Sequence, residues 1–215
     1  YDFNVEKAKE LLLINLEMRK KNPVIFDKRD VLNDSFQQAF RTFQICPLPK
    51  TTAENHKISI FRLVDSNPDN YVYTDICRMV VSMLDVRFVT EETNGELVDG
   101  EIGVIDLKGF GFKHLMKSAS NLSVFRGYMK YVQEGAPFKI VQNHFVNPPP
   151  MIDKFMAFAK PFMKKEVIES IKFHSSLESL YDYLPRDLLP NEFGGSAGFL
   201  DDFNDEWVKT VISKR

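Results

Sequence analysis

Residues 101–109 read Glu-Ile-Gly-Val-Ile-Asp-Leu-Lys-Gly, a short apolar run that ends at a glycine. The run is too short for a typical helix and has no polar alternation, which predicts a strand buried on both faces from Glu101 to Leu107. Strands of this kind occur in parallel sheets whose faces are covered by helices. The flanking segments are therefore expected to supply further strands and the helices that connect them.

The C-terminal half continues this alternation of helices and strands. Apolar residues at helical spacing from Leu115 to Val132 predict one long helix, which ends at Gly135-Ala136-Pro137. A second apolar strand, Phe138–Val146, is followed by Pro148–Pro150 and an amphipathic helix. The remaining expected elements are a short strand at Ile171–His174, a short helix at Leu177–Tyr183 and a final helix near Trp207.

The N-terminal part predicts helices first and then a change of pattern. Asn4 is a candidate N-cap for a helix from Val5 to Lys20 that stops at Pro23. Asp34 is a candidate N-cap for a second helix, and Pro47-Leu48-Pro49 closes this helical region. The elements expected next are a strand around Ile58, Ile60 and Leu63, a helix at Asp75–Phe88 and a loop at Thr90–Gly100.

The fold class that follows is α/β, with a mostly parallel sheet flanked by helices and long crossovers between strands. We expect a helical N-terminal region at residues 1–50 and a larger domain at residues 51–215.

Composition excludes several classes of function. The formal net charge of −2 over 215 residues gives no electrostatic support for nucleic-acid binding. No apolar run approaches the roughly 18 residues that a membrane span needs. Cys46 and Cys77 lie far apart without a CxxC motif, which indicates a reducing compartment and a cytoplasmic location. The 19 Phe and 8 Met residues fit either a solid core or the walls of an apolar cavity.

Motifs for catalysis or metal binding are weak. Gly194-Gly195-Ser196-Ala197-Gly198 matches the nucleophile elbow G-x-S-x-G, but the last histidine, His174, precedes it and no strand leads into it. A tight turn with glycine at positive φ is the preferred interpretation. The four histidines show no metal-ligand spacing, and no glycine-rich phosphate loop is present. We therefore expect no catalytic residue, metal or cofactor. Asp106, within the apolar strand, is either a hydrogen-bond hub or part of a site.

The helix after the triple proline has an apolar stripe with lysines outside it. Such a helix can cover an apolar cavity or lie on a membrane, although an ordinary core helix with a solvated lysine face has the same pattern. The prolines make its entry abrupt, and Pro161 is expected to weaken or kink its last turn. The residues expected on this gate are Met151, Ile152, Phe155, Met156, Phe158, Phe162 and Met163.

Several segments, in order, resemble the CRAL-TRIO lipid-binding domain family, in particular its tocopherol and retinaldehyde carriers of invertebrate type. The segments are Gly103–Phe110 with the helix after it, Pro137–Ile140, Phe145–Pro149, Phe158–Phe162 and Leu189–Gly195, and residues 7–23 resemble the end of the family's helical leader. The resemblance implies a sheet floor, an apolar cavity and a mobile gate helix from about Pro150 to Lys164. The implied cavity residues are Val80, Leu84, Val104, Leu107, Ile140, Phe145, Ile152, Phe155, Met156 and Ala159.

The resemblance also implies contact with a phosphoinositide or an anionic membrane beside the gate. Lys139 and Lys160 keep basic residues there, and Lys164 and Lys165 are nearby. Val141, Glu166 and Ser170 depart from the basic pattern, which weakens specific bisphosphate recognition. The function implied is intracellular transfer of one tocopherol-, retinoid- or other lipid-like molecule by a monomer that binds membranes transiently. The alternative is a lipid-sensing regulatory module that binds a protein partner.

Overall fold

A five-stranded sheet forms the centre of the molecule. The computed structural model describes residues 4–95 and 97–214, apart from the side chains of residues 91–94. The strands lie across the sheet in chain order, and neighbours are parallel except for the antiparallel pair β1 and β2. This arrangement confirms the predicted mostly parallel sheet. The strands are β1 (Phe43–Thr51), β2 (His56–Leu63), β3 (Gly100–Asp106), β4 (Ile140–Val146) and β5 (Ile171–Phe173).

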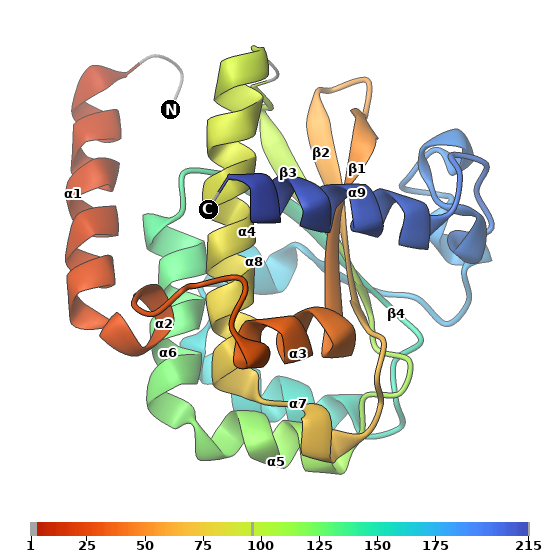
Figure 1. The fold of residues 1–215 in the computed structure, drawn as a ribbon. Coiled ribbons are helices and arrows are strands. Elements are labelled where there is room, and N and C mark those ends of the chain that lie inside the picture. Colours follow the sequence, from red (N-terminus) through yellow and green to blue (C-terminus); the bar gives the residue numbers. More distant parts are fainter. Residues whose placement is uncertain (1–3, 96, 215) are drawn as a thin grey trace.

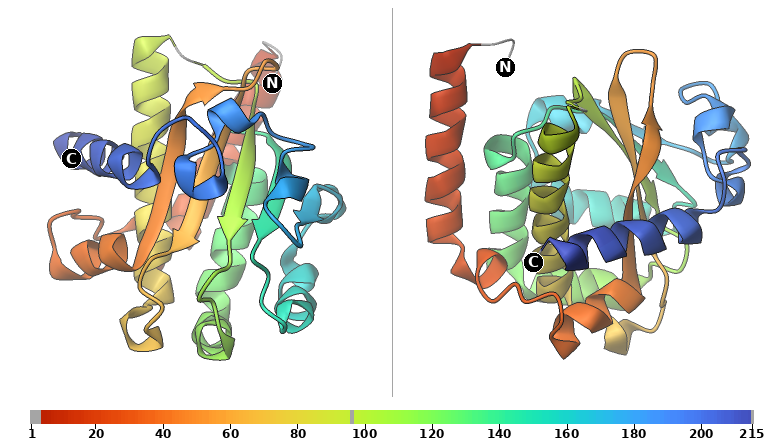
Figure 2. Two further views of the ribbon diagram at one scale, coloured as in Figure 1. Left: turned by 90° about the vertical axis from the view of Figure 1, so that its right-hand side faces the viewer. Right: turned by 45° about the horizontal axis from the view of Figure 1, so that its top comes forward.

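The crossover helices lie on one face of this sheet. Each crossover from β2 to β5 steps to the next strand in the same direction. Because parallel crossovers are right-handed, repeated steps in one direction place their helices on the same face, as Figures 1 and 2 show. This layer contains α4 (Tyr73–Asn94), α5 (Phe112–Ser120), α6 (Leu122–Lys130), the π-helical turn η2 (Tyr131–Gly135), α7 (Ile152–Ala159), the 3₁₀ turn η3 (Lys160–Phe162) and α8 (Lys165–Glu169).

The opposite face is covered by residues 175–199, which cross the strands with little regular structure (Figure 2, left). Three 3₁₀ turns, η4 (Glu178–Leu180), η5 (Arg186–Leu188) and η6 (Asn191–Phe193), lie in this segment. Leu180, Leu189 and Phe193 pack there against Ile60 and Val104 from the strands. Cover on both faces explains why β3 is apolar without alternation.

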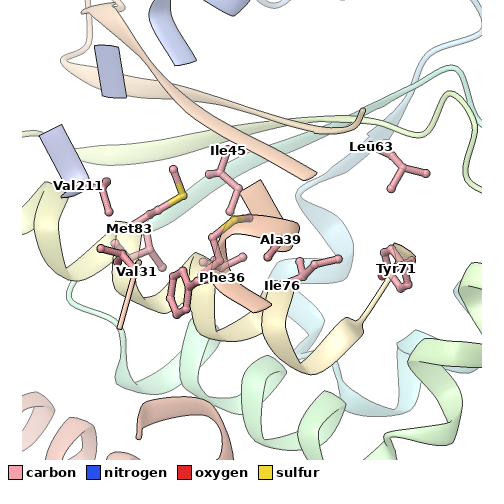
Figure 3. Close-up of a cluster of buried hydrophobic side chains, with 12 residues drawn as sticks. Val31, Phe36, Ala39, Ile45, Leu63, Tyr71, Ile76, Met83 and Val211 are labelled. Carbon is pink, nitrogen blue, oxygen red and sulfur yellow. The ribbon is translucent and has the colours of Figure 1, made fainter. Parts of the chain in front are cut away.

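Helices α3 (Asp34–Thr42) and α9 (Leu200–Ser213) complete the core at the β1 edge. Figure 3 shows the hydrophobic cluster in which Phe36 of α3, Met83 of α4 and Val211 of α9 gather near Ile45 of β1. Phe36 is fully buried. The predicted apolar face of the second helix therefore packs into the core, although Asn33, rather than Asp34, is its N-cap.

The N-terminal helices run along the outer edge of the helical layer (Figure 1). Helix α1 (Val5–Lys21) begins where predicted, because the Asn4 side chain accepts a hydrogen bond from the Lys7 N–H at 3.0 Å. Pro23 ends α1 by starting the short helix α2 (Pro23–Phe26). Arg19 and Arg29 both bind the Asp85 carboxylate of α4, which ties this region to the layer.

Four predicted elements differ from the structure. One is the helix expected at Leu177–Tyr183, which contains only the 3₁₀ turn η4. Residues 43–51, expected to close the helical region, form β1, so the predicted boundary at residue 50 lies inside a strand. Pro47 and Pro49 are tolerated because β1 is an edge strand, which has a ladder on one side alone, and because its pairing with β2 shifts register between Pro47 and Thr51. Helix α4 continues to Asn94, into the predicted loop, and the predicted long helix breaks at Asn121. Among the described residues, no helix combines the length and apolarity that a membrane crossing requires.

Candidate ligand-binding cavity

A cavity of about 280 Å³ lies between the helical layer and the sheet. This volume is close to the lower end of small-molecule pockets, roughly 300–1,000 Å³. All five strands contribute to its lining, together with α4 to α8. Most of the lining side chains are apolar or aromatic, as a site for a hydrophobic ligand requires.

Seven of the ten predicted cavity residues line this space. Val80 comes from α4, Leu107 follows β3, and Ile140 and Phe145 belong to β4. The gate segment contributes the other three, Phe155, Met156 and Ala159.

The structure corrects the predicted cavity wall at three positions. Val104 points to the opposite face, and its neighbour Ile105 lines the cavity, because a one-residue error in strand phase exchanges the two faces. Leu84 lies one turn beyond Val80, where α4 packs into the core cluster around Phe36. Ile152 is the first residue of α7 and lies outside the lining.

The predicted gate segment covers one side of the cavity. Met163 joins Phe155, Met156 and Ala159 in the lining, and the Phe155 ring stands edge-on to Phe110, with centroids 5.8 Å apart. Phe158 and Phe162 pack instead against Phe125 of α6, at centroid distances of 4.7 and 5.4 Å. Met151 and Ile152 lie half-buried at the entry and do not line the cavity.

The predicted gate segment has a break at each end. It follows Pro148–Pro150, and α7 ends at Ala159, where Pro161 converts the chain to the 3₁₀ turn η3. The change to a 3₁₀ turn at this point agrees with the expected weakening of the last turn by Pro161. Gln133 of η2 holds the far end, since its Nε2 donates to the Phe162 carbonyl at 2.9 Å and its Oε1 accepts from the Lys164 N–H at 2.7 Å.

The four predicted basic residues are exposed but do not form one cluster of free charges. Lys164 Nζ lies 3.4 Å from a Glu134 carboxylate oxygen, and Lys165 Nζ lies 3.6 Å from one of Glu169. Lys139 and Lys160 lie on the surface without an ion pair among the described residues. Two of the four charges are therefore partly neutralised.

Asp106 has both of the roles that the sequence left open. Its Oδ1 accepts hydrogen bonds from the Lys108 N–H at 2.9 Å and from Asn147 Nδ2 at 2.8 Å, and the residue also lines the cavity. The glycine motif is a turn, as preferred: Gly194 has φ 71°, and Tyr181 donates to the Phe193 carbonyl beside it. In the part of the chain that is described, no three His, Cys, Asp or Glu side chains lie close enough to share a metal ion.

Sequence reasoning missed two groups of polar residues. Tyr71, Tyr73, Cys77 and Tyr128 all line the cavity, although α4 and α6 are distant in the chain. On the opposite face of the sheet, His144 and His174 form a buried pair with Nδ1 and Nε2 2.9 Å apart. No spacing rule predicts either group, because strand and helix packing bring the residues together.

The chain is similar to proteins of known family over most of its length. The CRAL/TRIO domain model matches residues 42–195. The mouse alpha-tocopherol transfer protein-like protein is 31% identical over 208 residues, which cover 93% of this chain and 56% of that protein. Human clavesin-2 is 26% identical over 211 residues, 98% of this chain and 62% of its own length. The chain thus spans little more than half of these relatives.

The fold has a counterpart among solved structures. The crystal structure of Sfh5 superposes with a TM-score of 0.62 at 17% identity, and the match covers 100% of this chain and 76% of that one. At this identity the match supports the fold alone. The five segments that resemble the family all lie within the residues that the family model matches. The chain therefore belongs to the CRAL/TRIO family of lipid-binding domains.

Proposed function

We propose that this protein carries one hydrophobic small molecule in the cavity and exchanges it at membranes through the α7 gate, without catalysing a reaction. The observation that carries the proposal is an apolar cavity closed by a short helix whose Phe155, Met156 and Ala159 form part of its wall. A tocopherol-like or retinoid-like ligand has this chemistry, and one of the similar proteins is named for alpha-tocopherol transfer.

Burial of apolar surface supplies the driving force. Removal from water is worth about 25 cal/mol per Å², so a ligand that buries about 250 Å² gains about 6 kcal/mol. This gain competes with the membrane, which offers a similar apolar environment. Loading and release therefore depend on the gate and on specific contacts inside the cavity.

The surface near the gate supports transient contact with a membrane. Helix α5 lies at the same end of the molecule as α7 (Figure 1), and its Phe112 and Met116 are 54% and 50% exposed. Lys154 of α7 places its ammonium 5.9 Å from the Phe112 ring centroid. Exposed apolar side chains beside lysines favour an anionic membrane surface. With Lys164 and Lys165 paired, we propose general attraction to anionic lipid rather than specific phosphoinositide recognition.

A transfer assay between vesicles tests the carrier function. Donor vesicles would hold a fluorescent tocopherol analogue or all-trans-retinal, and acceptor vesicles a quencher. We expect the wild-type protein to accelerate movement of at least one of these ligands. Ala159→Trp should reduce the rate about tenfold or more because the indole fills the cavity, whereas Ala157→Trp on the exposed side of α7 should not. Equal losses in the two variants, or no transfer by the wild type, would contradict the proposal.

The alternative is a lipid-sensing module that binds a protein partner. One observation favours it: Leu12, Leu13 and Leu16 of α1 are 58%, 59% and 54% exposed, which is unusual for adjacent turns of one helix. Binding of a lipid without any transfer, together with loss of partner binding in Leu13→Asp, would support this alternative.

A further inference from the structure

One side of the cavity wall gathers three tyrosines and a cysteine. The other polar side chains of the lining, Asp106, Ser118, Gln133 and Asn143, are held in hydrogen bonds within the protein. Tyr73 is the first residue of α4, Tyr71 lies two residues before it, Cys77 lies one turn later and Tyr128 lies on α6. The rings of Tyr71 and Tyr73 stack with centroids 6.4 Å apart, and the Tyr73 ring stacks on Phe125 at 6.0 Å. These four side chains, called here the tyrosine pole, bring three hydroxyls and one thiol to the same region.

The hydrogen bonds within the tyrosine pole leave one hydroxyl, that of Tyr128, available to donate to a ligand. Ser118 Oγ donates its proton to the His114 carbonyl at 3.0 Å, so the Tyr71 hydroxyl must be the donor in its 3.1 Å contact with Ser118 Oγ. The Tyr73 hydroxyl interacts with the Cys77 thiol. The Tyr128 hydroxyl has no hydrogen bond to any described residue, although Tyr128 lines the cavity.

The four side chains of the tyrosine pole are uncharged. Burial raises the pKa of Tyr71, Tyr73 and Tyr128 well above the ordinary phenol range, and it raises the pKa of Cys77 to about 12. All four groups therefore keep their protons at physiological pH. Within the described part of the chain, no Lys, Arg or His lines the cavity, and its acid, Asp106, accepts hydrogen bonds from Lys108 and Asn147.

We propose that the tyrosine pole binds the single neutral head group of an otherwise apolar ligand, and that Tyr128 donates a hydrogen bond to an acceptor oxygen on it. A ketone, ester, ether or hydroxyl oxygen meets this requirement. A carboxylate or phosphate does not, because the lining has no cation to pair with it, and an unpaired buried charge is costly. The inference rests on the proposed carrier function and specifies its ligand class.

Three ligands with the same ten-carbon skeleton test the pole: decane, 2-decanone and decanoate. Each competes with the neutral fluorescent probe N-phenyl-1-naphthylamine for the purified full chain, which gives a dissociation constant for each. We expect decanoate to bind the wild type at least about tenfold more weakly than 2-decanone, since its charge finds no partner in the lining.

The variants separate the head group from the cavity. Tyr128→Phe should weaken 2-decanone about five- to tenfold and leave decane unchanged, because only the ketone loses a hydrogen bond. Tyr73→Phe, which removes a neighbouring hydroxyl, should also lower the preference for 2-decanone over decane. The matched control is Tyr131→Phe, whose fully buried hydroxyl binds Arg19 outside the cavity and should not change either affinity.

The outcomes distinguish the two proposals. If Tyr128→Phe weakens the binding of decane and 2-decanone equally, or changes neither affinity, the proposed role of the tyrosine pole is overturned. The proposed carrier function would remain. If decanoate binds as tightly as 2-decanone, the ligand class is overturned. If the probe and all three ligands fail to bind the wild type, both the pole and the carrier function are overturned.

Discussion

His144 occupies a fully buried position on β4, on the face of the sheet away from the cavity. Its Nδ1 lies 2.9 Å from His174 Nε2, and its Nε2 lies 2.9 Å from Gln142 Oε1. Burial lowers the pKa of His144 to about 4, and His174 and Lys172 add positive charge that acts in the same direction. Each neutral imidazole supplies one donor and one acceptor, which this chain of hydrogen bonds uses.

The lowered pKa predicts a specific loss of stability in acid. An unfolded histidine has a pKa near 6.5, so between about pH 6.5 and pH 4 the unfolded chain binds more protons than the folded one. The free energy of unfolding therefore falls as the pH falls through this window, by about 2–3 kcal/mol from His144 alone. Urea denaturation at a series of pH values measures it.

The variant His144→Gln should flatten this pH dependence because the new side chain does not titrate. His174→Gln should flatten it as well, since burial also lowers the pKa of His174. Parallel curves for the wild type and His144→Gln would show that the acid sensitivity arises elsewhere.

Residue by residue, two of the three misplaced cavity residues, Leu84 and Ile152, lie on helices, and the third, Val104, lies on β3. The central part of α7 agrees with the prediction. Phe155, Met156 and Ala159 follow a helical stripe that fixes one face. In β3 the neighbours Val104 and Ile105 are both β-branched and both enclosed, so no alternation indicates which of them meets the cavity. The tyrosine pole was beyond prediction, because Tyr73 and Tyr128 meet only after α4 and α6 have packed.

At the scale of elements, hydrogen bonds connect the proposed gate to the turn η2. Gln133 donates to the Met129 and Phe162 carbonyls and accepts from the Lys164 N–H, so it joins the end of α6 to the end of the gate. Helix α7 has no side-chain N-cap, and its eight residues form too short a helix to be stable alone. Its position therefore depends on packing and on this connection.

Removing the connection should accelerate ligand release. Gln133→Met keeps the side-chain length but loses both hydrogen bonds to the gate, worth about 2 kcal/mol, and we expect the release rate to rise about tenfold or more. Stopped-flow release of N-phenyl-1-naphthylamine into excess vesicles measures this rate. Glu134→Gln serves as the control, because its exposed ion pair with Lys164 is worth little. Similar rates in Gln133→Met and the wild type would contradict the role of Gln133.

The break between α5 and α6 at Asn121 could not be predicted from apolar periodicity. The apolar stripe continues through Asn121, so the sequence predicts one helix from Leu115 to Val132. Asn121 breaks it with φ −104° and ψ 47°, and its side chain donates to the Lys117 carbonyl at 2.9 Å, which satisfies the end of α5. An asparagine inside a helical pattern is compatible with either outcome, and packing on α4 and the gate decides between them.

For the whole molecule, the prediction of a mostly parallel sheet rested on the alternation of strands and crossovers. This pattern in the sequence was sufficient to predict the sheet type. The edge strand β1 was not predicted, since Pro47 and Pro49 are typical of loops. Its place is evident only from its pairing with β2, in which Ile45 lies opposite Phe61 and Cys46 opposite Ile60. The N-terminal helices are joined to this sheet through α3, so residues 1–50 do not end at a linker.

The two layers of the molecule should respond differently to a ligand. The cavity lies on the helical side of the sheet, while residues 175–199 pack against the opposite face around Leu180 and Leu189. A bound ligand adds contacts to Phe155 and Met156 of the gate but none to the opposite layer. Local opening of α7 therefore becomes more costly on binding, whereas local opening of residues 175–199 does not.

Hydrogen–deuterium exchange with and without N-phenyl-1-naphthylamine measures this asymmetry. We expect the amides of α7 to exchange about tenfold more slowly in the complex, which corresponds to about 1.4 kcal/mol of added local stability. The fast-exchanging amides of residues 175–199 should keep their rates, because they open without disturbing the cavity. The filled-cavity variant Ala159→Trp should lose the ligand effect on α7. Equal protection of both layers would mean that the ligand acts through global stability, and no protection of α7 would place the entry route elsewhere.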